Sequence, residues 1–149
     1  MRALDVAGQI INYCVSIDKP ITNLHLQKLL YFVDIYYLIN KKVRLIEENF
    51  EAWQYGPVIP NVYYEYSIFA AYPIGIIVKN IESFPKDFEG KLYGFIDKLA
   101  NMLAWDLVKI SHEENQPWYK TYHKYGEKSV IPNDLLKEYA DEQRQILSK

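Results

Sequence analysis

The 149-residue chain has the length of one ordinary domain, and its apolar fraction of 50% is enough to build a hydrophobic core. Charged residues make up 24% of the chain, so the composition is not that of a disordered protein. The formal net charge of −2 is shared evenly by the two halves, which argues against a broad surface for nucleic acid.

The single cysteine and the first residues of the chain both indicate the cellular compartment of the protein. Cys14 falls on the apolar side of a predicted helix, which is typical of a buried thiol in a reducing environment. The first residues lack the apolar core of a signal peptide, and no apolar run is long enough to cross a bilayer. We therefore expect a soluble, cytoplasmic protein with no membrane partner, built as a single domain over residues 1–149.

Two helices are predicted at the N-terminal end. Apolar residues recur at helical spacing over residues 3–15 and again from about 24 to 39. Thr22 or Asn23 can cap the second helix by accepting a hydrogen bond from a free backbone N–H. The buried stripe of this helix is expected to hold Leu26, Leu29, Leu30, Val33, Tyr37 and Leu38, while His25, Gln27, Lys28 and Asp34 lie outside it.

The segment that follows favours strands. Residues 44–46 and 50–55 are predicted as two strands, with a turn at 47–49 between them. Residues 74–78 are apolar and β-branched, so they could pair with this hairpin as a third strand.

Glycine and proline mark where the second strand ends. Gly56-Pro57 is expected to break the strand and turn the chain sharply. Pro60 fits the first turn of a short helix that reaches about Phe69.

The C-terminal half is predicted to be helical. A helical period runs from about 85 to 110, with a bend where Trp105-Asp106 interrupts it. A further helix begins at Pro117 and stops at Gly126, and the last one opens at Pro132. The fold class expected is mainly α (α+β): a compact domain of six to seven helices with a small antiparallel hairpin or three-stranded sheet.

No catalytic set is visible in the sequence. The three histidines and Cys14 form no pair at metal-ligand spacing. The chain has neither a nucleophile elbow nor a glycine-rich phosphate loop, and neighbouring carboxylates such as Glu113-Glu114 are common surface features. We therefore predict that the protein is not an enzyme and uses no metal or other cofactor.

A helix-turn-helix is the alternative that concerns nucleic acid. Residues 20–23 and the helix after them resemble its turn and recognition helix, where His25, Gln27 and Lys28 could face DNA. The helix continues with core-like residues, so a structural helix hairpin is favoured and a DNA-binding regulator stays as the alternative.

Three blocks, in this order along the chain, form a more specific pattern than any single motif. They are Ile21–Phe32, Phe50–Pro60 with Tyr63 and Tyr66 after it, and Leu107–Trp118. Together they resemble the Panacea domain family, also called the SocA-like antitoxin domain or the domain of phage-associated proteins. The family usually has Thr-His where this chain has Ser111-His112, and residues 70–90 match nothing in the pattern.

The resemblance implies an antitoxin of the kind found in prophages and other mobile elements. Its partner would be a cognate toxin encoded by a neighbouring gene, neutralised by direct protein contact. One type within the family is similar to a proteolytic adaptor, which makes a protease a second partner to consider. The protein itself would be a monomer or a homodimer.

The aromatic strand before Gly56-Pro57 is the main candidate for partner contact. Trp53 and Tyr55 would share one face beside a fixed turn, and rigid aromatic side chains are common at interface hot spots. Alternatively these residues, like His112 and Trp118, hold the shared scaffold, and partner choice lies elsewhere. The signature or contact residues predicted are Tyr31, Trp53, Tyr55, Gly56, Pro57, Pro60, Tyr63, Tyr66, His112 and Trp118.

Overall fold

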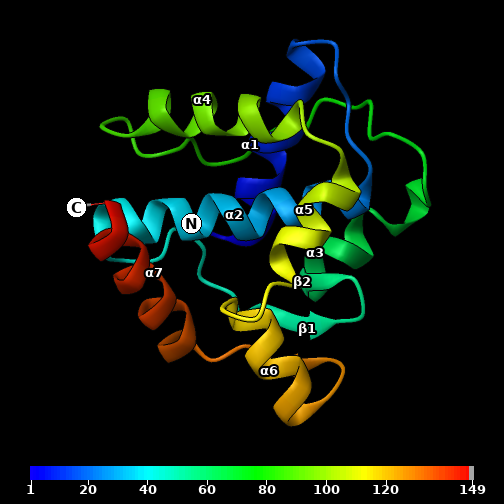
Figure 1. Ribbon diagram of the computed structural model, residues 1–149. Helices are drawn as coiled ribbons and strands as arrows, with labels where there is room; N and C mark the ends of the chain where they lie inside the picture. The colour runs from blue at the N-terminus through cyan, green and yellow to red at the C-terminus, as the bar shows by residue number, and fades with distance from the viewer. Residues whose placement is uncertain (148–149) are drawn as a thin grey trace.

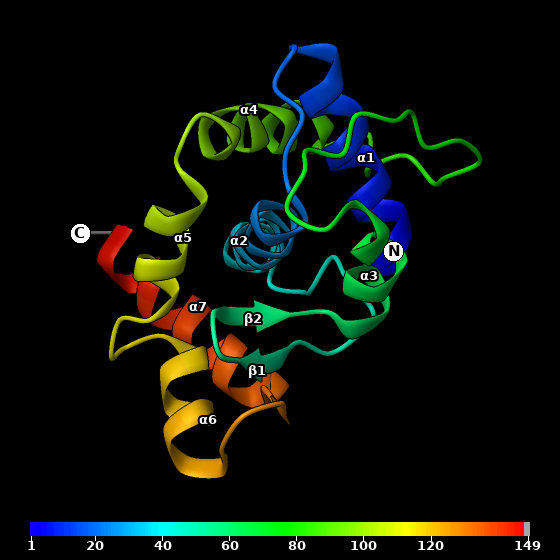
Figure 2. The ribbon, with the colours of Figure 1, turned by 90° about the vertical axis from the view of Figure 1, so that its right-hand side faces the viewer.

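The computed structural model describes residues 1–147, in which six helices surround a central one, α2 (Asn23–Lys41) (Figure 1). Figure 2 views α2 nearly end-on, with its neighbours around it. Within that part of the chain no helix is long and apolar enough to cross a membrane. The other helices are α1 (Ala3–Ser16), α3 (Pro60–Glu65), α4 (Glu89–Ala100), α5 (Ala104–Ser111), α6 (Pro117–Tyr125) and α7 (Asn133–Leu147).

A small antiparallel sheet lies beside α2 and completes the expected fold class. Its central strand is β1 (Glu51–Trp53), with β2 (Gly56–Val58) on one side and β3 (Ser129–Val130) on the other. The structure therefore confirms a mainly helical fold with a three-stranded sheet. The third strand comes from a place that the sequence did not predict, because a two-residue strand carries no periodic signal.

Gly56-Pro57 does not break the hairpin, which corrects the prediction. The turn is made by Gln54-Tyr55, and the chain then returns antiparallel, with Pro57 opposite Ala52. Proline is tolerated here because β2 is an edge strand of the sheet. Pro60 begins α3 as predicted, although α3 ends at Glu65 and a short 3-10 helix continues the chain to Phe69.

Residues 44–46 do not form the predicted strand. The N–H groups of Leu45 and Ile46 donate to one carboxylate oxygen of Asp34, at 2.8 and 3.1 Å. The other Asp34 oxygen accepts from Arg44 Nε at 2.7 Å. The backbone groups that a strand would need are thus taken by a side chain of α2.

Residues 74–78 also stay outside the sheet. The side chain of Asn12 in α1 binds both backbone groups of Val78, accepting from its N–H at 2.8 Å and donating to its carbonyl at 2.9 Å. The N–H of Ile74 donates to the carbonyl of Ile21. This extended segment is fixed to the N-terminal helices rather than to the hairpin.

The predicted long helix is two helices, but the break differs from the expected place. Residues 101–103 separate α4 from α5, and Trp105-Asp106 lies inside the first turn of α5. Asn101 ends α4 by donating its side-chain amide to the carbonyl of Asp97 at 2.7 Å. The two helices then run in different directions (Figure 1).

Helix α2 is buried on almost every side, which corrects the predicted stripe. Thr22 caps it as expected, by accepting from the His25 N–H. Gln27, Lys28 and Asp34, predicted to lie outside the stripe, are at most 1% exposed, whereas Tyr37 is only half-buried. The side chains that could have faced DNA are therefore enclosed, and the helix is structural.

Cys14 is fully buried in α1, as predicted. Burial raises the pKa of its thiol to about 11, so almost no thiolate forms near neutral pH.

Replacing Asp34 should destabilise the protein strongly. Asp34→Ala leaves two buried backbone N–H groups and the Nε of the largely buried Arg44 without their acceptor, and we expect a loss of about 3 kcal/mol in the free energy of unfolding. Urea denaturation measures it. The matched control is Asp141→Ala, which removes an exposed partner of Arg144 and should change stability by under about 0.5 kcal/mol. Similar losses for the two variants would contradict this account.

Candidate functional site

One row of polar side chains on α2 positions the hairpin. We call Asn23, Gln27, Lys28, Tyr31 and Asp34 the polar row; all five are buried. The Lys28 amine donates to the carbonyl of Pro57 at 2.9 Å, and Gln27 Oε1 accepts from the backbone N–H of Ile59 at 3.0 Å. The backbone of β2 and of the entry to α3 is thus bound directly by side chains of the central helix.

Two other residues of the polar row, Asn23 and Tyr31, reach further segments. The Asn23 amide donates to the carbonyl of Tyr63 in α3 at 3.0 Å. The Tyr31 hydroxyl donates to Gln116 Oε1 at 2.7 Å, and the Gln116 amide donates to the Tyr139 hydroxyl at 2.9 Å. Tyr31 therefore connects α2 to the start of α6 and to α7.

Gly56 occupies a corner that no larger residue fits. Its φ is +113°, in the region that favours glycine. A Cβ atom at this position would lie 2.8 Å from Ser111 Oγ and 2.9 Å from Lys28 Cε. The close approach of hairpin, α2 and α5 depends on the missing side chain.

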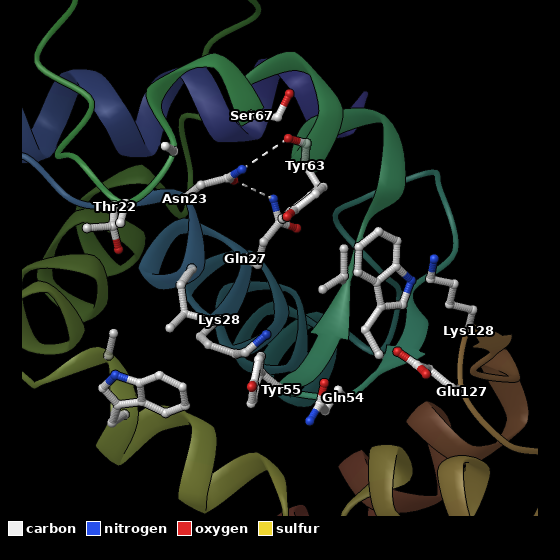
Figure 3. Close-up of a pocket in the computed structure, with 17 residues that line it drawn as sticks. Thr22, Asn23, Gln27, Lys28, Gln54, Tyr55, Tyr63, Ser67, Glu127 and Lys128 are labelled. Carbon is white, nitrogen blue, oxygen red and sulfur yellow. Dashed lines mark hydrogen bonds between the residues drawn. The ribbon is translucent and has the colours of Figure 1, made fainter.

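A pocket of about 740 Å³ opens between α2, the hairpin, α3 and the start of α5 (Figure 3). We call it the aromatic pocket. Its lining includes Gln27, Lys28, Trp53, Tyr55, Tyr63 and Trp105.

The aromatic side chains stand in two edge-to-face pairs around the pocket. Trp53 meets Tyr63 with ring centroids 5.0 Å apart, and Tyr55 meets Trp105 at 5.3 Å. The Trp53 indole N–H also donates to Glu51 at 3.0 Å, which fixes its ring. Tyr55 and Trp105 remain 48% and 54% exposed, so large apolar surfaces face solvent at the rim.

Lys28 is unusual in this site because it is a basic residue that is fully buried. Its side chain exposes no surface to solvent, and Figure 3 draws it among the residues that line the pocket. Among residues 1–147 it forms no ion pair, and its hydrogen-bond acceptor is the Pro57 carbonyl. Burial lowers the pKa of the amine to about 7, because the charged form loses its hydration.

His112 and Trp118 support the hairpin from the other side. Their rings stack with centroids 3.8 Å apart, and the Trp118 indole N–H donates to the carbonyl of Trp53 at 2.7 Å. His112 Nε2 is buried without a hydrogen-bond partner in the described part of the chain. Burial, followed by the nearby charges of Lys28 and His123, lowers the pKa of His112. Trp118, rather than His112, makes the backbone hydrogen bond.

The structure divides the predicted signature residues into two groups. Trp53, Tyr55 and Tyr63 line the aromatic pocket. The others belong to its frame: Tyr31, Gly56, Pro57, Tyr66 and Trp118 are buried, Pro60 begins α3, and His112 stacks on Trp118.

Sequence reasoning missed Lys28 and Trp105 as pocket residues. Ile35 is buried although it lies off the predicted stripe, and apolar residues on several faces are typical of an enclosed helix. That signal could have placed Lys28 inside. Trp105 interrupts the helical period, and a large aromatic side chain on the polar side of a helix indicates a contact surface.

No metal site accompanies the pocket. Within residues 1–147, no three or more His, Cys, Asp or Glu side chains gather in a way that could hold a metal ion.

Gly56→Ala should destabilise the protein more than Gly126→Ala. Both glycines have positive φ, so each substitution adds backbone strain of about 1–2 kcal/mol. At Gly126 nothing lies within 4 Å of an added Cβ, whereas at Gly56 the new atom collides with Ser111 and Lys28. We expect Gly56→Ala to lose about 2 kcal/mol more in urea denaturation. Equal losses would show that the corner is not tightly packed.

The stability of the protein should rise with pH through Lys28. The folded amine titrates near pH 7 and the unfolded one near its ordinary value of 10.5. Between these values the unfolded state binds more protons, so the wild type gains stability relative to Lys28→Met as pH rises, by at most about 1.4 kcal/mol per unit. Below pH 7 the difference levels off. Urea denaturation at pH 7, 8.5 and 10 measures the effect, and parallel curves for the two proteins would disprove it.

Comparison with known proteins identifies the family. The model of the family described as "Antitoxin SocA-like, Panacea domain" matches residues 26–119. The chain is 35% identical over 126 residues to antitoxin SocA from Caulobacter vibrioides (strain NA1000 / CB15N). This alignment covers 76% of this chain and 66% of that protein. The alignment thus spans just under two thirds of the relative's length, and no solved structure matches the chain. On these two matches, this chain belongs to the SocA-like antitoxin family and carries a Panacea domain.

Proposed function

We propose that this protein is a cytoplasmic antitoxin that neutralises a cognate toxin by direct contact, and that the toxin binds at the aromatic pocket. The protein binds and does not catalyse. Family membership and the name of the Caulobacter relative support the antitoxin role. Delivery of the toxin to a protease, the other route that the family resemblance implies, would use the same contact as its first step.

One observation carries the choice of surface. Tyr55 and Trp105 expose about half of their large rings, and they contact each other at the rim of a concave site. Rigid aromatic side chains in a pocket are the usual anchors of protein interfaces. Each ring is already held by a neighbour, so little side-chain entropy is lost when a partner binds.

The frame of the pocket explains how one fold could serve as a binding module. The polar row and the Trp118 hydrogen bond hold the hairpin from both sides. The exposed turn at Gln54-Tyr55 and the start of α5 can then vary in sequence without disturbing the frame. DNA binding through α2 is not proposed, because His25, Gln27 and Lys28 are buried.

Co-expression with the product of the neighbouring gene tests the proposal. The antitoxin should restore growth to cells that express this product, and a stable complex should co-purify. Tyr55→Ala and Trp105→Ala should each weaken the complex at least tenfold, about 1.4 kcal/mol or more, with an unchanged melting temperature. Titration calorimetry measures the affinity.

The matched control is Tyr125→Ala. Tyr125 is 60% exposed, close to the exposure of the two rim residues, but it lies outside the aromatic pocket. Its loss should leave affinity within about twofold of the wild type. Failure to restore growth together with failure to form a complex would refute the antitoxin role, whereas equal effects of all three variants would refute only the choice of surface.

A further inference from the structure

The aromatic pocket is bordered by a buried amine for which no residue among 1–147 supplies an anionic partner. Lys28 is fully buried at its edge, with one hydrogen bond to the carbonyl of Pro57. An ammonium group has three donors, so two of them remain without a partner among the described residues. A buried cation is ordinarily paired with an anion, because its lost hydration is otherwise uncompensated.

The charged and titratable groups around Lys28 do not supply that anion. His112 at the end of α5 is itself a base, and its pKa is lowered by burial and then by the charge of Lys28. Tyr55 lies on the hairpin side, and Glu127 and Lys128 line the pocket from the segment before β3. None of these side chains forms an ion pair with Lys28. Lys128 instead lies over the Trp53 ring, 4.9 Å from its centroid.

We propose that the aromatic pocket receives an acidic side chain of the partner toxin, whose carboxylate binds the Lys28 amine while its apolar neighbours pack against Trp53, Tyr55 and Trp105. The inference rests on the proposed function and specifies the chemistry of the contact. The occupant is a short segment with one Asp or Glu beside an apolar or aromatic residue. Charge complementarity favours this segment, because the Lys28 amine at the pocket edge has donors without an acceptor among the described residues.

Access to the amine requires one local movement. Lys28 borders the pocket but exposes no surface, and Tyr55, on the two-residue turn of the hairpin, lines the same pocket and is 48% exposed. Entry of the carboxylate therefore requires the half-exposed Tyr55 ring to move away from its contact with Trp105. The ring then covers the new ion pair and excludes water from it.

The energetics favour such a contact. The amine is already dehydrated in the free protein, so binding removes water only from the incoming carboxylate. The resulting ion pair lies in a poorly solvated site, where charge attraction is strong. Partners that present Lys or Arg at the same position are rejected by charge repulsion, which provides selectivity among toxins.

Proton uptake on binding tests this pairing. Free Lys28 has a pKa of about 7, so at pH 8 it is mostly neutral and takes up a proton when a carboxylate binds. Calorimetric titration of the wild-type protein with the neighbouring gene's product at pH 8, in phosphate and in Tris, should give an uptake of up to about 0.9 proton. Lys28→Met should abolish this uptake and weaken binding at least tenfold.

The matched control is Lys98→Met, which removes an exposed lysine of α4 that lies outside the aromatic pocket. It should keep the proton uptake and change affinity less than threefold. An unchanged affinity and uptake in Lys28→Met would overturn the inference and leave the proposed function intact, since the complex still forms. Absence of any complex with the wild type would overturn both. If Lys28→Met does not fold, the wild-type uptake decides alone: a value near zero contradicts the pairing.

Discussion

The central constraint on this fold is that α2 is enclosed by protein and yet carries a row of polar side chains. Each group of that row must find its partner inside the protein, because an unpaired buried donor or acceptor is strongly destabilising. Lys28 and Gln27 therefore bind the backbone of the hairpin, while Asp34 binds the chain before it. A shift of the hairpin by one residue would break several of these bonds at once. The polar row thus selects one arrangement of hairpin and helix from the many that apolar packing would allow.

The helices were predictable because their signals are local. Helical periodicity located α1 and α2, and proline and glycine marked both ends of α6. The predictions of strands at 44–46 and 74–78 were wrong, because backbone groups of these segments are bound by side chains 11 to 66 residues away. An isolated β-branched run does not reveal that an Asn or Asp from a distant helix will take the place of a neighbouring strand.

The candidate site was predictable only in part. Whether a pocket residue could be predicted depended on the direction in which its side chain points. The aromatic strand could be recognised, and Trp53, Tyr55 and Tyr63 do line one pocket. Lys28 was not assigned to it, because one-face periodicity places a lysine in solvent by default, although apolar residues on several faces of α2 indicated an enclosed helix. Buried frame residues and exposed pocket residues alternate along the same short segment, with Gly56 turned inwards and Tyr55 outwards. This alternation allows a family to keep the inward residues while the outward ones change with the partner.

The buried thiol of Cys14 has a practical consequence. Since it is the single cysteine and hardly forms thiolate at neutral pH, maleimide reagents should leave the native protein unmodified. A cysteine introduced at the exposed Gln54 would then be the sole site of labelling. A fluorophore attached there would stand at the tip of the hairpin, and its emission would report directly on occupancy of the neighbouring hollow in solution.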